Sequence, residues 1–255
     1  KIAYLKKQIR QLQAETTTMV MREMKKRKPA FILARGDFQQ PGKQVKPNVP
    51  VIFGRLPDDQ HQTRLDLANW LTTPDHPLVS RVRVNHLWKM LMGTGLVRTA
   101  GDFGTQGELP SHPELLDWLA NRFVKSGWDT NSLIYDIVTS ATYRQQSRFH
   151  KDSVQVDPRN RLLSRAPRFR LTAEEIRDMA LASSGQLNPV IGGPSVRPFQ
   201  PLNYFSANSG QRWQADTGET ARRRAIYTYL QRTAPFPAHL IFDAPSRQIC
   251  TATRP

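Results

Sequence analysis

The chain has 255 residues, which is enough for one large or two small domains with a sizeable core. It carries 37 basic and 21 acidic residues, and the net charge of +16 favours anionic partners such as nucleic acid, acidic lipid, sulfated polysaccharide or an acidic neighbouring domain. The single cysteine, Cys250, excludes an intrachain disulfide, a cysteine-rich zinc site and haem attachment through a Cys-x-x-Cys-His motif. No run of residues is apolar for long enough to span a membrane, and no signal peptide is recognisable.

The first 59 residues predict a leading helix and a small β segment. Residues 1–14 place their apolar side chains on one helical stripe, whereas residues 17–23 and 31–35 have the composition of strands. Four prolines and three glycines between residues 36 and 59 indicate an ordered loop or edge strand and a domain boundary. We therefore divide the chain into residues 1–59 and residues 60–255.

Residues 62–185 have the periodic apolar faces of a helical core. A first helix, with Leu67 and Leu71 on its apolar face, is expected to end before residue 74. Asp75 is expected to cap a second helix, which stops at Gly93 because glycine often ends a helix.

Two capping boxes predict the starts of later helices. In residues 111–114 and 172–175 a Ser or Thr precedes a Glu by three positions, so each side chain can bond the amide of the other residue. The two helices that follow are expected to end at Gly127 and Gly185. Asp129 is expected to cap the helix that lies between them.

Residues 186–220 are predicted to be a long polar loop, of a length that is usually functional or disordered in compact domains. After this loop, residues 225–230 and 239–242 have the composition of strands. The expected fold is mainly α, a multi-helix core with small β additions at the N- and C-terminal ends (α+β). The helical core, the long loop and the terminal β segment belong to the second predicted domain.

Four potential metal ligands, His86, Asp102, His112 and Glu114, lie in one short stretch of the chain. Histidine and carboxylate side chains are ligands that zinc and iron use in proteins. Their spacing matches no metal-binding motif, and His112 and Glu114 also fit a helix start, so a metal site is the weaker interpretation. The sequence contains neither a nucleophile elbow nor a phosphate loop, and we assign no catalytic residue.

A structural polar network is predicted in the same stretch. Arg81 and Asn85 share a helix face because they are four residues apart. We expect both side chains to be buried and to bond the loop at residues 101–104, where Asp102 pairs with an arginine, because the backbone groups of this glycine-rich loop need partners. The predicted network consists of Arg81, Asn85, Asp102, Ser111 and Glu114.

A candidate anion site is predicted where Arg222, Arg223 and Arg224 follow the aromatic residues Tyr204 and Trp213. Guanidinium groups bind sulfate, phosphate or carboxylate in a bidentate manner, and aromatic faces stack on sugar rings or bases. The same arginines would equally pair with acidic groups of a neighbouring domain. Nucleic acid would be favoured only by one continuous stripe of arginines, and we do not expect it as the partner.

Long segments of the chain resemble a known family. Residues 64–146 include RLDLANWLTTPDHPLVSRVRVNHLWKMLMGTGLVRT and SHPELLDWLANRFVKSGWDTNSLIYDIVTSATYR, and later segments read DPRNRLLSRAPRFRLTAEEIRDMALASSGQLN and RRRAIYTYLQRTAPFPAHLIFDAPSRQIC. Together they resemble the planctomycete-specific C-terminal domain of unknown function, family 1553 of such domains. His86 stands where arginine is more usual in that family, and residues 129–131 differ from its common Ser-x-Lys.

The resemblance implies a position at the C-terminal end of a large exported protein of the periplasm or cell envelope, beside a cytochrome-c module. It also implies that the domain continues past Pro255 and is truncated here. The family carries no established activity, so no catalytic residue is transferred. No cofactor is expected in this chain, and haem would belong to an upstream domain.

The expected function is therefore a non-catalytic binding or scaffolding module. Its expected partners are the upstream domains of the same polypeptide and an anionic polysaccharide. One alternative is a redox or hydrolytic enzyme that acts on an anionic or sulfated polysaccharide, and convergence of the four potential metal ligands would favour it. The other alternative is a nucleic-acid-binding domain.

If the positive charge serves an anionic polymer, the chain should bind a sulfated polysaccharide at low salt and release it as salt rises, because surface charges are screened within about 8 Å at physiological ionic strength. The neutral polymer of the same backbone should bind far less. Joint replacement of Arg222, Arg223 and Arg224 should weaken binding more than replacement of residues 25–28. Equal, weak binding to both polymers in a titration would contradict this prediction.

Overall fold

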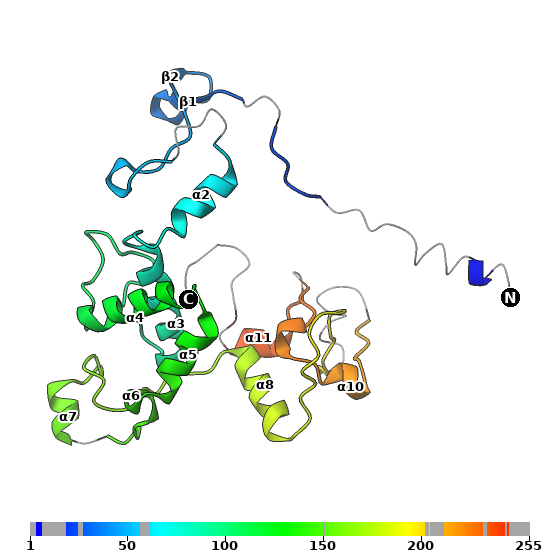
Figure 1. Cartoon of the computed structure of the whole chain (residues 1–255). Helices are drawn as coiled ribbons and strands as arrows, with labels where there is room; N and C mark the ends of the chain where they lie inside the picture. Colours follow the sequence, from blue (N-terminus) through cyan, green and yellow to red (C-terminus); the bar gives the residue numbers. More distant parts are fainter. Residues whose placement is uncertain are drawn as a thin grey trace. The chain divides into compact units, whose positions relative to one another are not determined.

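Figure 1 shows the computed structural model, which describes residues 4–6, 19–24, 28–56, 62–149, 151–201, 204, 212–231, 234–242 and 244. The chain divides into two compact units, residues 1–77 and residues 78–255. Most of the predicted leading helix, the basic residues 25–27 and Cys250 lie outside the described residues.

The first unit contains a two-stranded antiparallel sheet. It consists of strands β1 (Ala30–Leu33) and β2 (Pro41–Val45), with an irregularity in the register near the end of β1. The 3-10 helix η1 (Ala34–Gly36) follows β1 and begins the turn, in which Gly36 has a positive φ of 80°. A second 3-10 helix, η2 (Val51–Phe53), follows β2.

The predicted leading β segment is confirmed only in part. The strand expected at residues 31–35 is confirmed as far as Leu33, after which η1 begins. The strand expected at residues 17–23 is wrong for residues 19–23, which belong to no sheet. A strand needs a neighbour to satisfy its backbone groups, and the described hairpin pairs only with itself.

Helix α2 (Arg64–Leu71) also lies in the first unit, although the sequence analysis grouped it with the second predicted domain. It begins with a capping box that we did not predict, formed by Thr63 and Asp66. The indole nitrogen of Trp70 donates a hydrogen bond of 3.1 Å to the carbonyl of Phe53 at the end of η2. This bond fixes α2 against the segment that precedes it.

The second unit holds the other helices of the described chain. They are α3 (Val79–Met92), α4 (Pro113–Lys125), α5 (Thr130–Thr139), α6 (Ala141–Arg144), α7 (Lys151–Val156), α8 (Ala173–Ser183), α10 (Gly218–Ala221), η3 (Ala225–Tyr227) and α11 (Pro237–Ile241). None of the described helices combines the length and the apolar composition that a membrane crossing requires.

Helices α3, α4 and α5 pack around one hydrophobic core (Figure 1). The apolar faces predicted for α4 and α5 are confirmed, because their central residues are at most 3% exposed, namely Leu116, Leu119, Phe123, Leu133 and Ile137. Burial of each such side chain contributes roughly 1.5–3 kcal/mol. These three helices therefore form the part of the second unit on which the adjoining loops are built.

Helix α3 ends as predicted but begins later. Gly93 follows its last residue with a φ of 76°, a conformation that favours glycine. The N-cap is Leu78 and not Asp75, because turns at residues 74–75 and 77–78 delay the helix. A Cβ atom at position 93 would also lie 2.7 Å from the ring of Phe169, so glycine permits this close approach.

The capping box predicted at the start of α4 is wrong. His112 occupies the N-cap position and its side chain caps no amide. Ser111 instead bonds the carbonyl of Leu96 through its amide, at 2.9 Å, and through its hydroxyl, at 3.3 Å. Pro113 at the first helical position has no N–H group, so one fewer donor needs a partner there.

The other helix ends are confirmed. The carboxylate of Asp129 accepts hydrogen bonds from two amides in the first turn of α5. Thr172 and Glu175 form the predicted capping box of α8. Gly127 and Gly185 follow α4 and α8 with φ values of 73° and 68°.

The C-terminal β segment is wrong as predicted. Residues 239–242 lie mostly in α11, which starts at Pro237, and the fixed φ of proline suits the first turn of a helix. Residues 225–230 begin as η3, and Thr228 forms only an isolated parallel bridge with Val196. The fold is therefore mainly helical, and the described sheet lies in the first unit.

Asn85 joins α3 to the loop that follows it. Its side chain is fully buried, and its amide accepts a hydrogen bond of 2.8 Å from the Val97 amide and donates one of 2.9 Å to the Val97 carbonyl. The loop passes so close that a Cβ atom at Gly95 would lie 2.8 Å from both polar atoms of this side chain. One asparagine therefore satisfies two buried backbone groups at once.

We predict that Asn85→Ala destabilises the chain by roughly 2–4 kcal/mol, because it leaves the buried N–H and C=O groups of Val97 without partners. Urea unfolding followed by circular dichroism measures this loss. Arg83→Ala, at an exposed position of the same helix, should change the free energy of unfolding by less than about 0.5 kcal/mol. Equal unfolding midpoints for the two variants would show that the Asn85 bonds contribute little.

Candidate functional site

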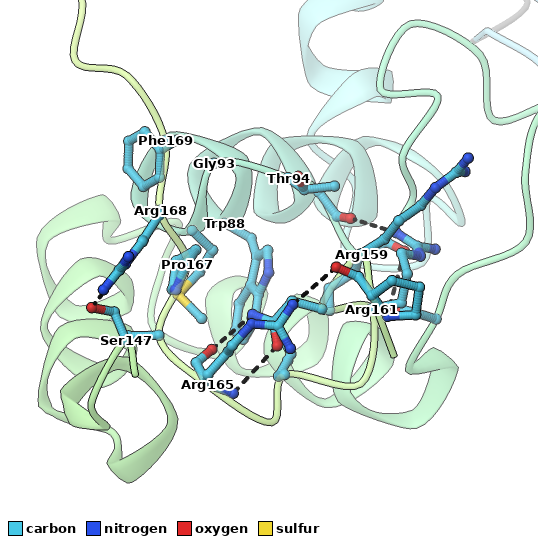
Figure 2. Close-up of a pocket in the computed structure, with 18 of the residues that line it drawn as sticks. Trp88, Gly93, Thr94, Ser147, Arg159, Arg161, Arg165, Pro167, Arg168 and Phe169 are labelled. Carbon is cyan, nitrogen blue, oxygen red and sulfur yellow. Dashed lines mark hydrogen bonds between the residues drawn. The ribbon is translucent and has the colours of Figure 1, made fainter. Parts of the chain in front are cut away.

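A cavity of about 280 Å³ lies in the second unit, between the C-terminal end of α3 and residues 147–169 (Figure 2). Trp88, Met92 and Leu96 form its apolar side, and they belong to the hydrophobic core. We call it the arginine-lined pocket because Arg159, Arg161, Arg165 and Arg168 complete its lining.

The segment that forms the outer side of the pocket is held by a buried carboxylate. Asp157, which is 7% exposed, accepts hydrogen bonds from the amides of Arg161, at 2.8 Å, and Leu162, at 2.6 Å. Asn160 and Leu163 both have positive φ values, of 52° and 58°. Such a conformation costs roughly 1–2 kcal/mol for a residue like leucine, so the surrounding bonds and packing must hold it.

Two of the four arginines are fixed by the protein itself. Arg165 is 6% exposed, and its guanidinium donates to the backbone carbonyls of Asp157, at 3.2 Å, and Pro158, at 2.9 Å. Arg161 donates to the Gly95 carbonyl at 3.4 Å and lies 4.0 Å from Glu108. Both side chains shape the pocket, and the burial of Arg165 leaves that guanidinium little exposed area for a ligand.

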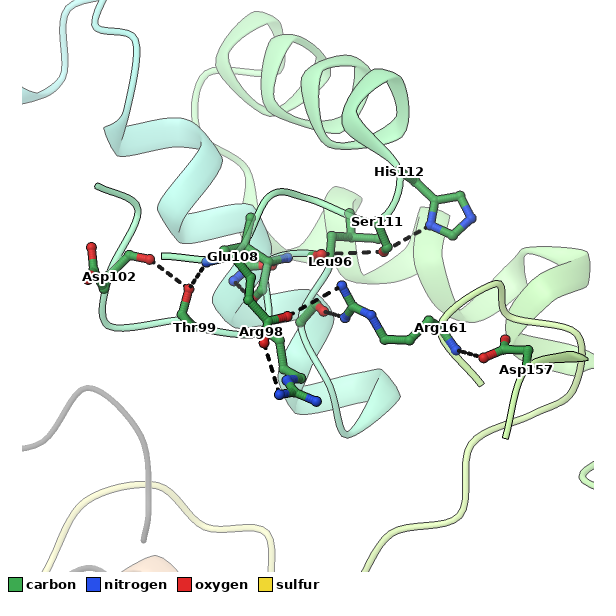
Figure 3. A network of polar contacts seen from close by, with 12 residues as sticks. Leu96, Arg98, Thr99, Asp102, Glu108, Ser111, His112, Asp157 and Arg161 are labelled. Carbon is green, nitrogen blue, oxygen red and sulfur yellow. Dashed lines mark hydrogen bonds and ion pairs between the residues drawn. The ribbon is translucent and has the colours of Figure 1, made fainter. Parts of the chain in front are cut away.

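Glu108 connects the pocket to the loop after α3 (Figure 3). Its carboxylate forms an ion pair of 2.9 Å with Arg98 and reaches Arg161 on its other side. Its backbone amide donates to the hydroxyl of Thr99 at 3.0 Å. One carboxylate thus neutralises part of the charge of two arginines.

The other two arginines can meet a ligand. Arg159 is exposed, and none of the described residues bonds its guanidinium. Arg168 donates to the Ser147 hydroxyl at 3.3 Å and lies 4.8 Å from the ring centre of Phe149, which is 56% exposed. The pocket therefore offers guanidinium groups, a hydroxyl and an aromatic ring to solvent.

The composition of the lining decides which chemistry the pocket can perform. Its described residues include no Asp, Glu, His or Cys, and therefore no ordinary general base or thiol nucleophile. Its polar side chains are arginine, serine, threonine and asparagine, which donate hydrogen bonds and, in the case of arginine, carry positive charge. The arrangement is suited to holding an anion.

The four potential metal ligands do not converge. A ring nitrogen of His86 contacts the Ala100 carbonyl at 3.2 Å, and one of His112 contacts the Ser111 hydroxyl at 3.0 Å. Asp102 accepts from the Gly104 amide at 2.7 Å, and Glu114 is exposed on the first turn of α4. Over the part of the chain that the structure describes, no three His, Cys, Asp or Glu residues are grouped as metal ligands.

The predicted polar network is only partly correct. Asn85 is buried, but it bonds Val97 and not the loop at residues 101–104. Arg81 is half-buried and forms an ion pair of 2.5 Å with Asp117 of α4. The hydrogen bond from Arg81 lowers the pKa of Asp117, its positive charge acts in the same direction, and partial burial opposes both effects.

Asp102 closes its own loop and pairs with none of the described arginines, contrary to prediction. Its carboxylate accepts from an amide two residues on, and its carbonyl accepts from the hydroxyl of Thr99 at 2.8 Å. The loop thus satisfies its backbone groups internally, because a short side chain within a turn reaches the nearby amides without help from α3.

The three consecutive arginines of the predicted anion site have different surroundings. Arg223 is 6% exposed, donates to two backbone carbonyls in residues 192–194 and lies 4.1 Å from the ring centre of Tyr227. Arg222 pairs with Glu219 at 3.2 Å, and Arg224 with Asp178 at 3.7 Å. Arg223 thus supports the fold, whereas the charges of the other two are partly neutralised.

The aromatic residues of that predicted site also bond the backbone. The indole nitrogen of Trp213 donates to the Pro198 carbonyl at 2.9 Å, and the hydroxyl of Tyr204 donates to the Pro235 carbonyl at 3.0 Å. Anion binding by this group stays a prediction.

The arginine-lined pocket was not predicted from the sequence, although the sequence contains a signal for it. Between residues 144 and 170 there are seven arginines and one lysine, against two aspartates. The net charge of the whole chain does not reveal this local excess. An arginine such as Arg165 is held by backbone carbonyls, whereas Arg159 is open to a ligand. No sequence pattern identifies which carbonyls will lie near a given arginine.

We predict that Arg165→Ala lowers the free energy of unfolding by about 2–3 kcal/mol, because the buried Asp157 carbonyl and the partly buried Pro158 carbonyl lose a charged donor. Arg159→Ala removes the same side chain from an exposed position and should leave stability unchanged. Thermal unfolding of the two variants beside the parent chain provides the comparison. Similar losses in both would mean that Arg159 is also structural.

The pocket lies within a region that matches a known family. The model of the family PSD1, described as "Protein of unknown function (DUF1553)", matches residues 63–255, which include α2 and the second unit. Comparisons with curated proteins and with solved structures gave no match. The match covers most of the chain and agrees with the resemblance seen in its sequence, and the chain therefore belongs to the DUF1553 family of proteins of unknown function.

Proposed function

We propose that this chain is a non-catalytic binding module that holds an acidic group in the arginine-lined pocket. The observation that carries the proposal is the combination of Arg159, which has no partner among the described residues, with Arg168 and the exposed ring of Phe149. Guanidinium groups bind sulfate, carboxylate and phosphate through paired hydrogen bonds. The two arginines lie on opposite sides of the pocket (Figure 2), and an acidic group bound at either one would replace the solvent around its guanidinium.

The size of the cavity limits the ligand. A volume of about 280 Å³ is at the lower end of the range for small-molecule pockets and suits one small acidic group with its immediate attachment. Phe149 adds an apolar face beside the charge, which a sugar ring bearing a sulfate or a carboxylate would cover. We therefore propose an acidic unit of a polysaccharide as the ligand.

The setting of this module is a proposal that rests on the family resemblance. We propose that the chain is part of an exported planctomycete polypeptide of the periplasm or cell envelope and acts beside a cytochrome-c module. Haem would belong to that module. The +16 charge supports contact with acidic surfaces of upstream domains as well as with a polymer.

The proposal predicts that Arg159→Ala combined with Arg168→Ala weakens binding of a sulfated heparin oligosaccharide by about tenfold to a hundredfold at low salt, since two charged hydrogen-bond donors are lost. Isothermal titration of the full chain measures the affinity. The chemically desulfated oligosaccharide should bind far less, and added salt should weaken binding of the sulfated form.

The matched control is Arg144→Ala combined with Arg148→Ala, which removes two exposed arginines of the same segment that do not line the pocket. This control should retain most of the affinity. An equal loss in both double variants would reduce the proposal to general attraction by positive charge. Tighter binding of single-stranded DNA than of the sulfated oligosaccharide, with the same dependence on Arg159 and Arg168, would favour nucleic acid instead.

A further inference from the structure

A second cavity, of about 400 Å³, lies on the outer side of α4 and α5. We call it the tryptophan groove. The side chains of α4 that line it include Trp118, Asn121 and Arg122, and α5 contributes Asp136. Phe123 and Leu133, which are 2% exposed, lie at its base and belong to the core, so the groove rests on a rigid support.

Trp118 contributes little to the hydrophobic core of the second unit. Its side chain is 56% exposed, whereas the core-facing residues of the same helix, such as Leu116 and Leu119, are 3% exposed. Helix α4 therefore buries its apolar face without the help of this ring. A large aromatic side chain that lies in a cavity and contributes little to the core is typical of a contact for a ligand.

The orientation of the ring is set by a neighbouring ion pair. The guanidinium of Arg122 lies 5.7 Å from the ring centre of Trp118 and forms two parallel hydrogen bonds with the carboxylate of Asp136, one of them 2.9 Å long. The side-chain hydrogen bonds from Arg122 to Asp136 raise the pKa of the Arg122 guanidinium. The two bonds restrain the guanidinium of Arg122 beside the Trp118 ring, so this side of the groove is present without a ligand.

The polar groups around the ring include both donors and acceptors. Asn121 is exposed and offers an amide with both functions, and the Asp136 carboxylate retains lone pairs beyond the two bonds from Arg122. The charges of Arg122 and Asp136 largely cancel, and Lys125, which is exposed and also lines the groove, leaves one positive charge there. The groove therefore differs from the arginine-lined pocket, where donors and positive charge predominate.

We propose that the tryptophan groove binds a neutral hexose ring of an oligosaccharide. A pyranose presents an apolar face of C–H groups, which would cover the exposed face of Trp118. Its equatorial hydroxyls donate and accept at once, which matches the mixed rim of Asn121, Arg122 and Asp136. A simple anion would not use the ring, and a purely apolar partner would leave the ion pair without solvent.

Saturation-transfer NMR on the full chain tests this proposal. The probes are neutral tetrasaccharides of three hexose polymers, namely β-1,4-glucan, α-1,4-glucan and β-1,4-mannan. At least one should receive saturation at its ring protons, and Trp118→Ala should weaken its binding about tenfold, whereas Trp118→Phe should retain part of it. Binding should change little with salt, because no net charge is neutralised.

Two control variants separate binding in the groove from binding elsewhere on the chain. Tyr135→Ala removes an aromatic ring of α5 that is 68% exposed and does not line the groove, so it should not affect binding. Arg159→Ala combined with Arg168→Ala should leave binding of the neutral tetrasaccharide unchanged, so failure of the arginine-lined pocket and failure of the groove are separate results. Circular dichroism and urea midpoints should show that Trp118→Ala remains folded.

The proposal is overturned if no tetrasaccharide gives a signal that depends on Trp118, or if Tyr135→Ala weakens the signal as much as Trp118→Ala does. A mononucleotide that binds more tightly than every tetrasaccharide, with the same dependence on Trp118, would also overturn it. That result would identify the ring as a platform for nucleobases.

Discussion

The bonds between Asn85 and Val97 are the constraint on which the candidate site depends. They hold the loop after α3 against the helix, and this loop presents two carbonyls to later parts of the chain. The Leu96 carbonyl receives both bonds from Ser111 and thereby positions the start of α4. The Gly95 carbonyl receives Arg161, which belongs to the segment that forms the outer side of the pocket. The side-chain amide of Asn85 therefore connects the core to the site. Its loss would be costly, because the buried backbone groups of Val97 would have no partner.

The arginines of this chain show that net charge and available charge are different quantities. Arg165 and Arg223 are almost fully buried and use their guanidinium groups to satisfy backbone carbonyls in irregular segments. Regular helices satisfy their own backbone, but the long stretches without regular structure in the second unit need other donors. The five N–H donors of a guanidinium suit this task, since one side chain can reach two carbonyls. Part of the +16 charge thus serves the fold, and only the remainder can serve a partner.

The two cavities of the second unit have complementary chemistry. One offers several arginines and hydrogen-bond donors beside a phenylalanine, and the other offers a tryptophan whose polar rim contains both donors and acceptors. Each lies where the α3–α5 core ends and polar side chains begin, so the same core supports both. If both cavities bind ligands as proposed, one module would recognise a sugar ring by its shape and an acidic substituent by its charge. Their separate dependence on salt follows from this difference in charge.

Elements that arise from local interactions could be predicted from the residues alone. The apolar periodicity of α4 and α5, the glycines after α3, α4 and α8, and the cap at Asp129 follow from steric and hydrogen-bonding rules within a few residues. The family resemblance was also readable from the sequence, because it depends on residue identity along the chain. Predictions that required a partner distant in the sequence were wrong more often. The strand expected at residues 239–242 became α11 because Pro237 favours a helix start and the described residues there form no adjoining strand.

By contrast, only the tertiary structure determines which polar side chains can contact a ligand. Arg159 and Arg165 lie six residues apart in the same basic segment, yet one is exposed and the other is buried against two carbonyls. Ser111 had the right spacing for a capping box, but it bonds Leu96, fifteen residues earlier. Both cases have the same cause. A hydrogen bond depends on distance and direction in space, and the backbone groups that compete for a side chain are present at every position, so their location is set by the fold and not by the residue type.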